Sequence, residues 1–145
     1  MLRRDYFLKM IEEAGYVLAR LLGLRQEGRY QEALELVNDI YKDLFPFDPD
    51  LVHHTKPEDL PDLLRNEYNL TEEHLAILAD LLRAEADLWY DRGVWEKATL
   101  CLQRSLALIQ YLDDAHPEEY SFDRIQKLAE ITEKLKDALP PDSHT

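Results

Sequence analysis

Two six-residue stretches decide the fold: Gly28-Arg29-Tyr30-Gln31-Glu32-Ala33 and Gly93-Val94-Trp95-Glu96-Lys97-Ala98. Each has the order glycine, any residue, aromatic, two polar residues, alanine, and each lies between two segments with helical periodicity. Glycine permits the left-handed turn that ends a helix, and alanine lets two helix axes approach closely. We therefore expect each stretch to join two antiparallel helices, with the aromatic ring filling the open end of the hairpin.

The segments that flank the first stretch carry apolar residues at spacings of three and four, which is the pattern of an amphipathic helix. In the first segment, for which Asp5 is the expected N-cap, these residues are Phe7, Met10, Ile11, Ala14, Leu18, Leu21 and Leu22. In the second they are Tyr30, Ala33, Leu34, Val37, Ile40, Tyr41 and Leu44. Prolines 46 and 49 end the second helix, because proline lacks the amide donor and clashes with the preceding turn.

Residues 46–69 form an irregular connection in this interpretation. Thr55 and Glu58 have the spacing of a capping box, which predicts a short helix through Leu60, Leu63 and Leu64. Pro61 favours a late start for that helix, because proline is best tolerated in a first turn.

The segments that flank the second stretch predict a longer and more buried hairpin. Thr71 is the expected N-cap, with Leu70 and Leu75 placed as a hydrophobic staple. The helix then presents Leu78, Leu81, Leu82, Ala86 and Trp89 inward and ends at Gly93. The next helix carries Trp95, Ala98, Leu102, Ser105, Leu106 and Ile109 on one face, and its apolar surface is widened by Leu100, Cys101, Leu108, Tyr111 and Leu112. So wide an apolar surface requires neighbours on two sides.

The sequence thus predicts a single all-α domain over residues 1–145. It consists of a first hairpin (1–45), a connection with a short helix (46–69), a second hairpin (70–115), a capping helix (117–139) and a tail (140–145). The capping helix is predicted from inward-facing Phe122, Ile125, Leu128, Ala129, Leu135 and Leu139.

The second hairpin, over residues 79–112, resembles the tetratricopeptide repeat, a stacked helix hairpin of about 34 residues. The resemblance rests on small, aromatic and large residues in the family's order, at Ala86, Trp89, Tyr90, Ala98, Leu102 and Ser105. Glu85 stands where the family has leucine, Gln110 where a closing proline is common, and Leu21 at the small position of the first copy. Gly28 and Gly93 are 65 residues apart, nearly two repeat lengths, so a degenerate segment separates the copies.

The whole chain also resembles a family of small, uncharacterised bacterial proteins of about this length. The residues that carry this resemblance are 4–12, the helix over 30–44 and the later hairpin. It implies no activity, because that family has none assigned.

The charge of the chain excludes several classes of partner. Its 145 residues include 30 Asp and Glu against 17 Lys and Arg, a net charge of −13. Residues 46–93 carry −8 of this, residues 1–45 only −1 and residues 94–145 carry −4. Such a field repels phosphate, so we expect no nucleic-acid partner and no docking on an anionic membrane.

The cellular compartment is inferred from what the sequence lacks. No apolar run approaches the roughly 18 residues of a membrane span. Charged residues interrupt the basic N-terminal stretch before a signal peptide can form. Since Cys101 is the only cysteine, a cytoplasmic location fits best.

The residues that could carry chemistry all have a simpler interpretation. His53 and His54 adjoin several carboxylates, but neighbouring side chains in a loop preset no ligand geometry, so we interpret them as a solvated loop rather than a metal site. His74 and His116 are interpreted as surface or capping residues, and Cys101 as an inert core thiol. The chain has no nucleophile-elbow, P-loop or dinucleotide-binding motif. We therefore expect no catalytic, cofactor-binding or metal-ligating residue.

The tetratricopeptide resemblance implies a partner-binding groove on the exposed side of the first helix of each hairpin. The corresponding residues are Asp80, Arg83, Asp87, Tyr90 and Asp91, with Leu22, Arg25 and Gln26 from the first hairpin. Asp80 and Asp87 would repel a peptide's terminal carboxylate, so a basic or mixed peptide is the more compatible partner. The alternative, that these residues are merely solvated or covered by residues 46–69, remains open at this point.

Two hypotheses of function follow. The leading one is a non-enzymatic interaction module that binds a protein or peptide, or a second copy of itself. The alternative is a small-molecule sensor or minor enzyme with a pocket between the hairpins and residues 46–69, lined by aromatic residues that are otherwise interpreted as core: Tyr6, Tyr16, Tyr68, Trp89 and Tyr120.

Overall fold

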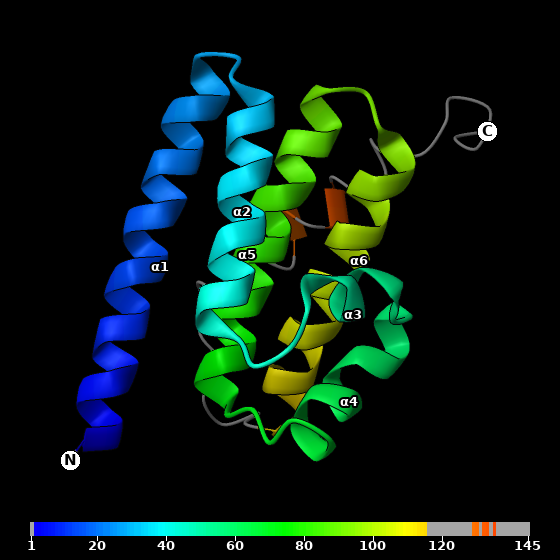
Figure 1. The fold of residues 1–145 in the computed structure, drawn as a ribbon. Coiled ribbons are helices and arrows are strands. Elements are labelled where there is room, and N and C mark those ends of the chain that lie inside the picture. The colour runs from blue at the N-terminus through cyan, green and yellow to red at the C-terminus, as the bar shows by residue number, and fades with distance from the viewer. Residues whose placement is uncertain (1, 116–128, 131, 134, 136–145) are drawn as a thin grey trace. The chain divides into compact units, whose positions relative to one another are not determined.

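A computed structural model of the chain describes residues 2–115, 129–130, 132–133 and 135 (Figure 1). Residues 2–115 contain six α-helices and one short 3-10 helix, residues 129–130, 132–133 and 135 are also helical, and none of these ranges contains a strand. The predicted all-α class is therefore confirmed. The chain divides into two compact units, Met1–His54 and Thr55–Thr145, which are described in turn. The predicted capping helix lies largely outside the described residues, and the predicted tail lies entirely outside them.

The first unit is built on a helix hairpin. Helices α1 (Leu2–Gln26) and α2 (Tyr30–Leu44) pack against each other, and α2 also contacts the short α3 (Pro49–His54). Gly28 joins the two long helices with a φ of +73°, as the sequence predicted. The expected N-cap at Asp5 is wrong, because α1 already begins at Leu2 and residue 5 lies within it.

The core of the first hairpin follows the predicted pattern more closely on α2 than on α1. On α2 the predicted residues Ala33, Val37, Ile40, Tyr41 and Leu44 are all buried. On α1 the buried side chains are Met10, Ala14, Val17, Leu21 and Leu24. Ile11 and Leu22, which we expected to face inward, are 49% and 52% exposed. They lie outside the arc of α1 that carries its buried side chains, so the predicted apolar stripe was too wide.

The second unit contains a short 3-10 helix (Pro57–Asp59), α4 (Leu60–Asn66), α5 (Glu72–Asp91) and α6 (Trp95–Ala115). Helices α5 and α6 form the principal hairpin, and α4 and the 3-10 helix pack on α6 (Figure 1). Residues 46–69 are thus more ordered than predicted, with α3 in addition to the expected α4. Pro61 lies in the first turn of α4, as predicted, but the capping box at Thr55 is wrong because Lys56 occupies the N-cap position without a side-chain bond.

Two arginines tie the connection of the second unit to α6. Arg65 Nε donates to the Tyr111 hydroxyl at 3.2 Å, and its Nη1 donates to the Leu70 carbonyl at 2.8 Å. Arg104 Nε donates to the Thr55 carbonyl at 2.9 Å. The bonds to Thr55 and Leu70 satisfy backbone carbonyls outside the helices, so they fix the chain before and after α4.

The start and the end of α5 confirm the predicted signals. The Thr71 hydroxyl accepts from the His74 amide, and His74 Nδ1 accepts in return from the Thr71 amide, which completes a capping box. Leu70 and Leu75 are both buried, in keeping with the predicted hydrophobic staple. Gly93 ends the turn that follows with a φ of +76°. Helix α5 is thus defined at both ends by local sequence.

None of the helices in the described part of the chain combines the length and apolarity that crossing a membrane requires.

Candidate functional site

The α5–α6 hairpin positions most of the predicted partner-binding residues. Ala79, Ala86, Ala98 and Ser105 are buried at its contact, with exposed fractions of 1% or less. The Ser105 hydroxyl donates to the Ala79 carbonyl at 2.7 Å and so joins the two helices directly. Small residues at these positions permit close packing of the helix axes, which fixes the rotation of α5 and hence the side chains that it presents outward.

The predicted residues on α5 share one outward face of the helix. Asp80, Arg83, Asp87 and Tyr90 follow one another at spacings of three or four residues, and all four are half-buried. Asp91 extends the row and is exposed. Three of these five side chains are aspartates, so the face is predominantly acidic.

Arg83 contributes less positive charge to this face than the sequence suggests. Its guanidinium forms an ion pair with the exposed carboxylate of Glu130. The pair adds a further carboxylate beside the one cationic side chain of the row, so carboxylates outnumber cations among these side chains. An anionic ligand is disfavoured on this face.

Tyr90 and Trp95 form an aromatic pair at the open end of the hairpin. Their ring centroids are 4.9 Å apart and the planes meet at 75°, an edge-to-face contact. Trp95 begins α6 beside the turn, in keeping with the predicted aromatic at the open end of the hairpin. It is 44% exposed, so it fills this end only in part.

The other predicted groove residues, Arg25 and Gln26, belong to the first unit. They form the last turn of α1, where Arg25 is half-buried and Gln26 is exposed. Leu22 lies one turn earlier on the same helix and is exposed.

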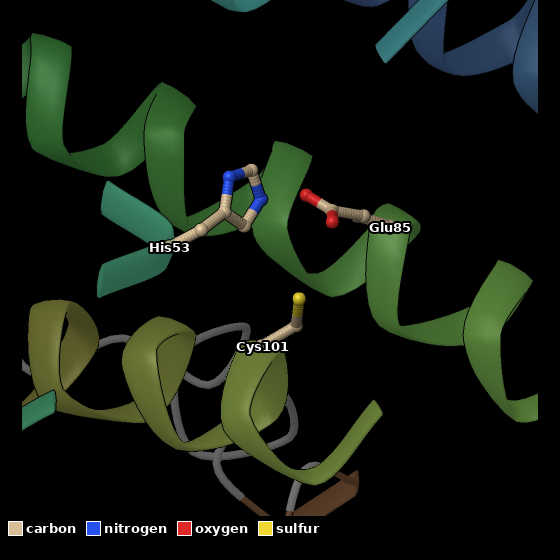
Figure 2. A group of neighbouring side chains, drawn as sticks. All are labelled: His53, Glu85 and Cys101. Atoms are coloured by element: carbon tan, nitrogen blue, oxygen red, sulfur yellow. The ribbon is translucent and has the colours of Figure 1, made fainter. Parts of the chain in front are cut away.

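The second hairpin contains a buried carboxylate at a position where the tetratricopeptide family has leucine. Glu85 on α5 is 5% exposed, and a carboxylate oxygen of it lies within 4.8 Å of the Cys101 Sγ on α6 (Figure 2). The indole Nε1 of Trp89 donates to the same carboxylate at 2.9 Å. Glu85 and Trp89 are four residues apart on the helix, a spacing that could have suggested this bond from the sequence.

Cys101 is buried, as predicted, with 2% of its surface exposed. Burial, and then the negative charge of Glu85, raise the pKa of the Cys101 thiol well above its ordinary value. Arg104 and Lys97 oppose this shift to a smaller degree. Because a thiol must ionise to act as a nucleophile, this environment favours the inert core role.

Trp89 links the buried carboxylate to the surface of the hairpin. While its indole N–H binds Glu85, its ring is covered by the Lys97 ammonium, which lies 4.4 Å from the ring centroid. A cation over an indole face is an attractive contact. Lys97 thus contacts the face of the Trp89 ring, and Glu85 accepts the hydrogen bond from its polar edge.

Some of the histidines lie in a different kind of structure from the one that the sequence predicted. His53 and His54 end α3 and so are not in a loop, which corrects the predicted solvated loop. His53 is half-buried and meets the Tyr41 ring edge-on, with centroids 5.8 Å apart, whereas His54 is exposed. His53, which Figure 2 also draws, belongs to the first unit. His74 caps α5, as predicted, and His116 lies outside the described residues.

The aromatic residues of the alternative hypothesis do not share one environment. Tyr16 is 67% exposed on α1, so its predicted core role is wrong. Tyr68 and Trp89 are half-buried in the second unit. The side chains of Tyr6 and Tyr120 lie outside the described part of the chain.

Comparison of the chain with protein-family models, with curated proteins and with solved structures finds no match.

Proposed function

We propose that this chain is a non-enzymatic interaction module built from tetratricopeptide-like hairpins, and that the acidic face of α5 binds a basic or mixed segment of another protein. The observation that carries the proposal is the row Asp80, Asp87 and Asp91 on a helix whose rotation is fixed by close packing against α6. A rigid helix face with one predominant sign of charge selects partners of the opposite sign.

The two turns support the repeat-like part of the proposal. In the first, the amides of Gly28 and Arg29 donate to the carbonyls of Arg25 and Leu24 at 3.1 and 2.9 Å. The equivalent bonds in the second run from Gly93 to Tyr90 at 3.0 Å and from Val94 to Trp89 at 2.9 Å. The two glycines have φ values of +73° and +76°. The same sequence motif thus makes the same turn twice, as repeated hairpins require.

The aromatic pair beside the acidic row supports a peptide as the partner. Tyr90 belongs to the row, and Trp95 adds exposed apolar surface at its end. Aromatic side chains are typical anchors of protein interfaces, because they bury much area at little cost in side-chain entropy. A segment with basic residues near an apolar residue would match both features.

Peptide binding by the full chain tests this proposal. Two fluorescent peptides with the same apolar residues, one carrying lysines and the other glutamates, are titrated and their anisotropy is measured. We expect the lysine peptide to bind at least about tenfold more tightly, with a preference that falls as salt is added. The double variant Asp80→Asn with Asp87→Asn should lose about tenfold of the lysine peptide's affinity.

The matched control changes the same net charge elsewhere in the second unit. Glu96→Gln with Asp114→Asn removes two exposed carboxylates from α6 and should leave the affinity within about twofold of the unchanged chain. Equal losses in the two double variants would show that only the overall charge matters, and equal binding of the two peptides would exclude the acidic face as the determinant.

A further inference from the structure

Helix α1 carries two apolar stripes, of which only one is buried. Leu8 and Ile11 are each 49% exposed, and Leu22 is 52% exposed. With 3.6 residues per turn, positions 8, 11 and 22 follow one line along the helix. Together with Tyr16 they make up four of the five large hydrophobic side chains that are exposed in the described part of the chain. Exposed apolar side chains are thus concentrated on one helix.

Gly15 lies in the middle of this line, four residues after Ile11 and seven before Leu22. A Cβ built on Gly15 would meet nothing within 4 Å, and its φ is not in the left-handed region. Glycine weakens the interior of a helix, and neither the turn geometry nor the packing of the described residues requires it here. A second helix laid along the stripe would provide a steric reason, because the missing side chain lets two helix axes approach closely.

The charge of α1 is opposite in sign to that of the chain. Residues 2–26 contain five Lys or Arg against three Asp or Glu, a net charge of +2, whereas the whole chain carries −13. Two copies of α1 face to face would place like charges together. An occupant with acidic edges would be attracted to the net positive charge of this helix instead.

We propose that the α1 stripe, defined as Leu8, Ile11, Gly15 and Leu22, docks an amphipathic helix of another protein whose polar edges are acidic. The apolar residues of that helix pack along the stripe, with its axis closest at Gly15. This surface belongs to the other unit and favours the opposite charge from the α5 face. The inference therefore does not rest on the function proposed for α5.

The test uses the full chain and a synthetic helical peptide with leucines at spacings of three and four and glutamates beside them. A second peptide has lysine in place of each glutamate. We expect the glutamate peptide to bind at least about tenfold more tightly in calorimetric titrations. Ile11→Ser with Leu22→Ser should lower its affinity at least about tenfold, because the apolar contacts are lost.

Two matched controls separate docking from general effects on α1. Tyr16→Ser removes an exposed apolar side chain from the same helix but off the stripe, and should leave the affinity within about twofold. Gly15→Ala should raise the stability of the chain in the absence of peptide, yet it should weaken peptide binding. Gly23 lies about 100° around the helix from Leu22, so Gly23→Ala should leave binding unchanged. The opposite signs of the two Gly15→Ala effects are not expected from a merely structural role.

Several outcomes would overturn the proposal. These are equal affinity of the two peptides, equal losses in Tyr16→Ser and the stripe variant, or a dimer in sedimentation that Ile11→Ser dissociates, since a second copy would then occupy the stripe. Asp80→Asn with Asp87→Asn should not change glutamate-peptide binding. A failure of the α5 proposal and a failure of this one are therefore distinguishable.

Discussion

The two hairpins have nearly identical turns, but the first helix of each is buried to a very different extent. Gly28 and Gly93 share the left-handed conformation, and Ala33 and Ala98, five residues later, are both fully buried. Yet α5 is buried on several sides, with Leu75, Leu78, Leu81 and Leu82 all at 0% exposure, while α1 leaves a whole apolar stripe exposed. A local motif can thus fix how a helix pair is joined without fixing how much of each helix is covered.

The polar groups in the core sharpen this contrast. Among the described residues, the buried polar or charged side chains are Glu85, Arg104 and Ser105, all on α5 or α6. Each makes a hydrogen bond, to Trp89, to Thr55 and to Ala79 respectively. Satisfied polar groups in a core specify one arrangement of the helices. The second hairpin is therefore the more tightly specified of the two.

The largest expected difference between the hairpins is the cost of truncating a leucine. Leu82→Ala removes a fully buried side chain from α5 and should lower the free energy of unfolding by about 2–5 kcal/mol. Leu22→Ala removes a half-exposed side chain from α1 and should change it by less than about 0.5 kcal/mol. Urea denaturation followed by circular dichroism measures both. Comparable losses would mean that the outward side of α1 is packed, and the comparison would fail.

The glycines provide the next largest effect and test whether the two turns are equivalent. Gly28→Ala and Gly93→Ala should each lower the free energy of unfolding by about 1–2 kcal/mol, because alanine is strained at positive φ. An added Cβ meets nothing at either site, so strain alone sets the cost and the two losses should agree. Gly15→Ala, in a normal helical conformation, should raise stability by up to about 1 kcal/mol. Unequal losses at the two turns in thermal unfolding would show that the turns are not equivalent.

The features that the sequence predicted well are those that depend on neighbouring residues. The Gly28 and Gly93 turns, the Thr71 cap and the place of Pro61 in the first turn of α4 all follow from backbone preferences within a few positions. The buried face of α2 could also be predicted, because its apolar residues form a single stripe. Local signals of this kind need no knowledge of the rest of the fold.

The features that the sequence missed depend on distant contacts. Ile11 and Leu22 have the same spacing pattern as the buried residues of α1, so periodicity could not tell which stripe faces α2. Glu85 stands where the tetratricopeptide family has leucine, and its burial as a carboxylate depends on the bond from Trp89 and on packing against α6. The acidic row on α5 could be placed on one helix face, but the Arg83 ion pair with Glu130 links positions 47 residues apart and had no local signal.

The helix caps give a smaller difference between the hairpins. Thr71→Ala removes the capping bond of α5 and should lower the free energy of unfolding by about 1 kcal/mol. The N-cap of α2 is Arg29, which makes no side-chain cap bond and only exposed ion pairs with Glu27 and Glu32, so Arg29→Ala should cost less. Thr71→Ser is the control, since it retains the hydroxyl. A larger loss for Arg29→Ala than for Thr71→Ala would contradict this ranking.

The smallest effect concerns the pH dependence that Cys101 gives to the second hairpin. Burial and Glu85 raise the pKa of its thiol in the folded state above the ordinary value of 9.0, so the unfolded chain ionises first as pH rises. The stability due to the neutral buried thiol is therefore complete below pH 9.0 and is lost as pH rises from there toward the raised folded value. Between pH 9 and 9.5 the loss should stay below about 1 kcal/mol. Cys101→Ala should unfold with a shallower pH dependence, since tyrosine and lysine titrations affect both proteins alike. Identical slopes in urea titrations across this range would show that the folded thiol ionises as readily as the unfolded one, and Cys101 would then not belong to the tightly specified core.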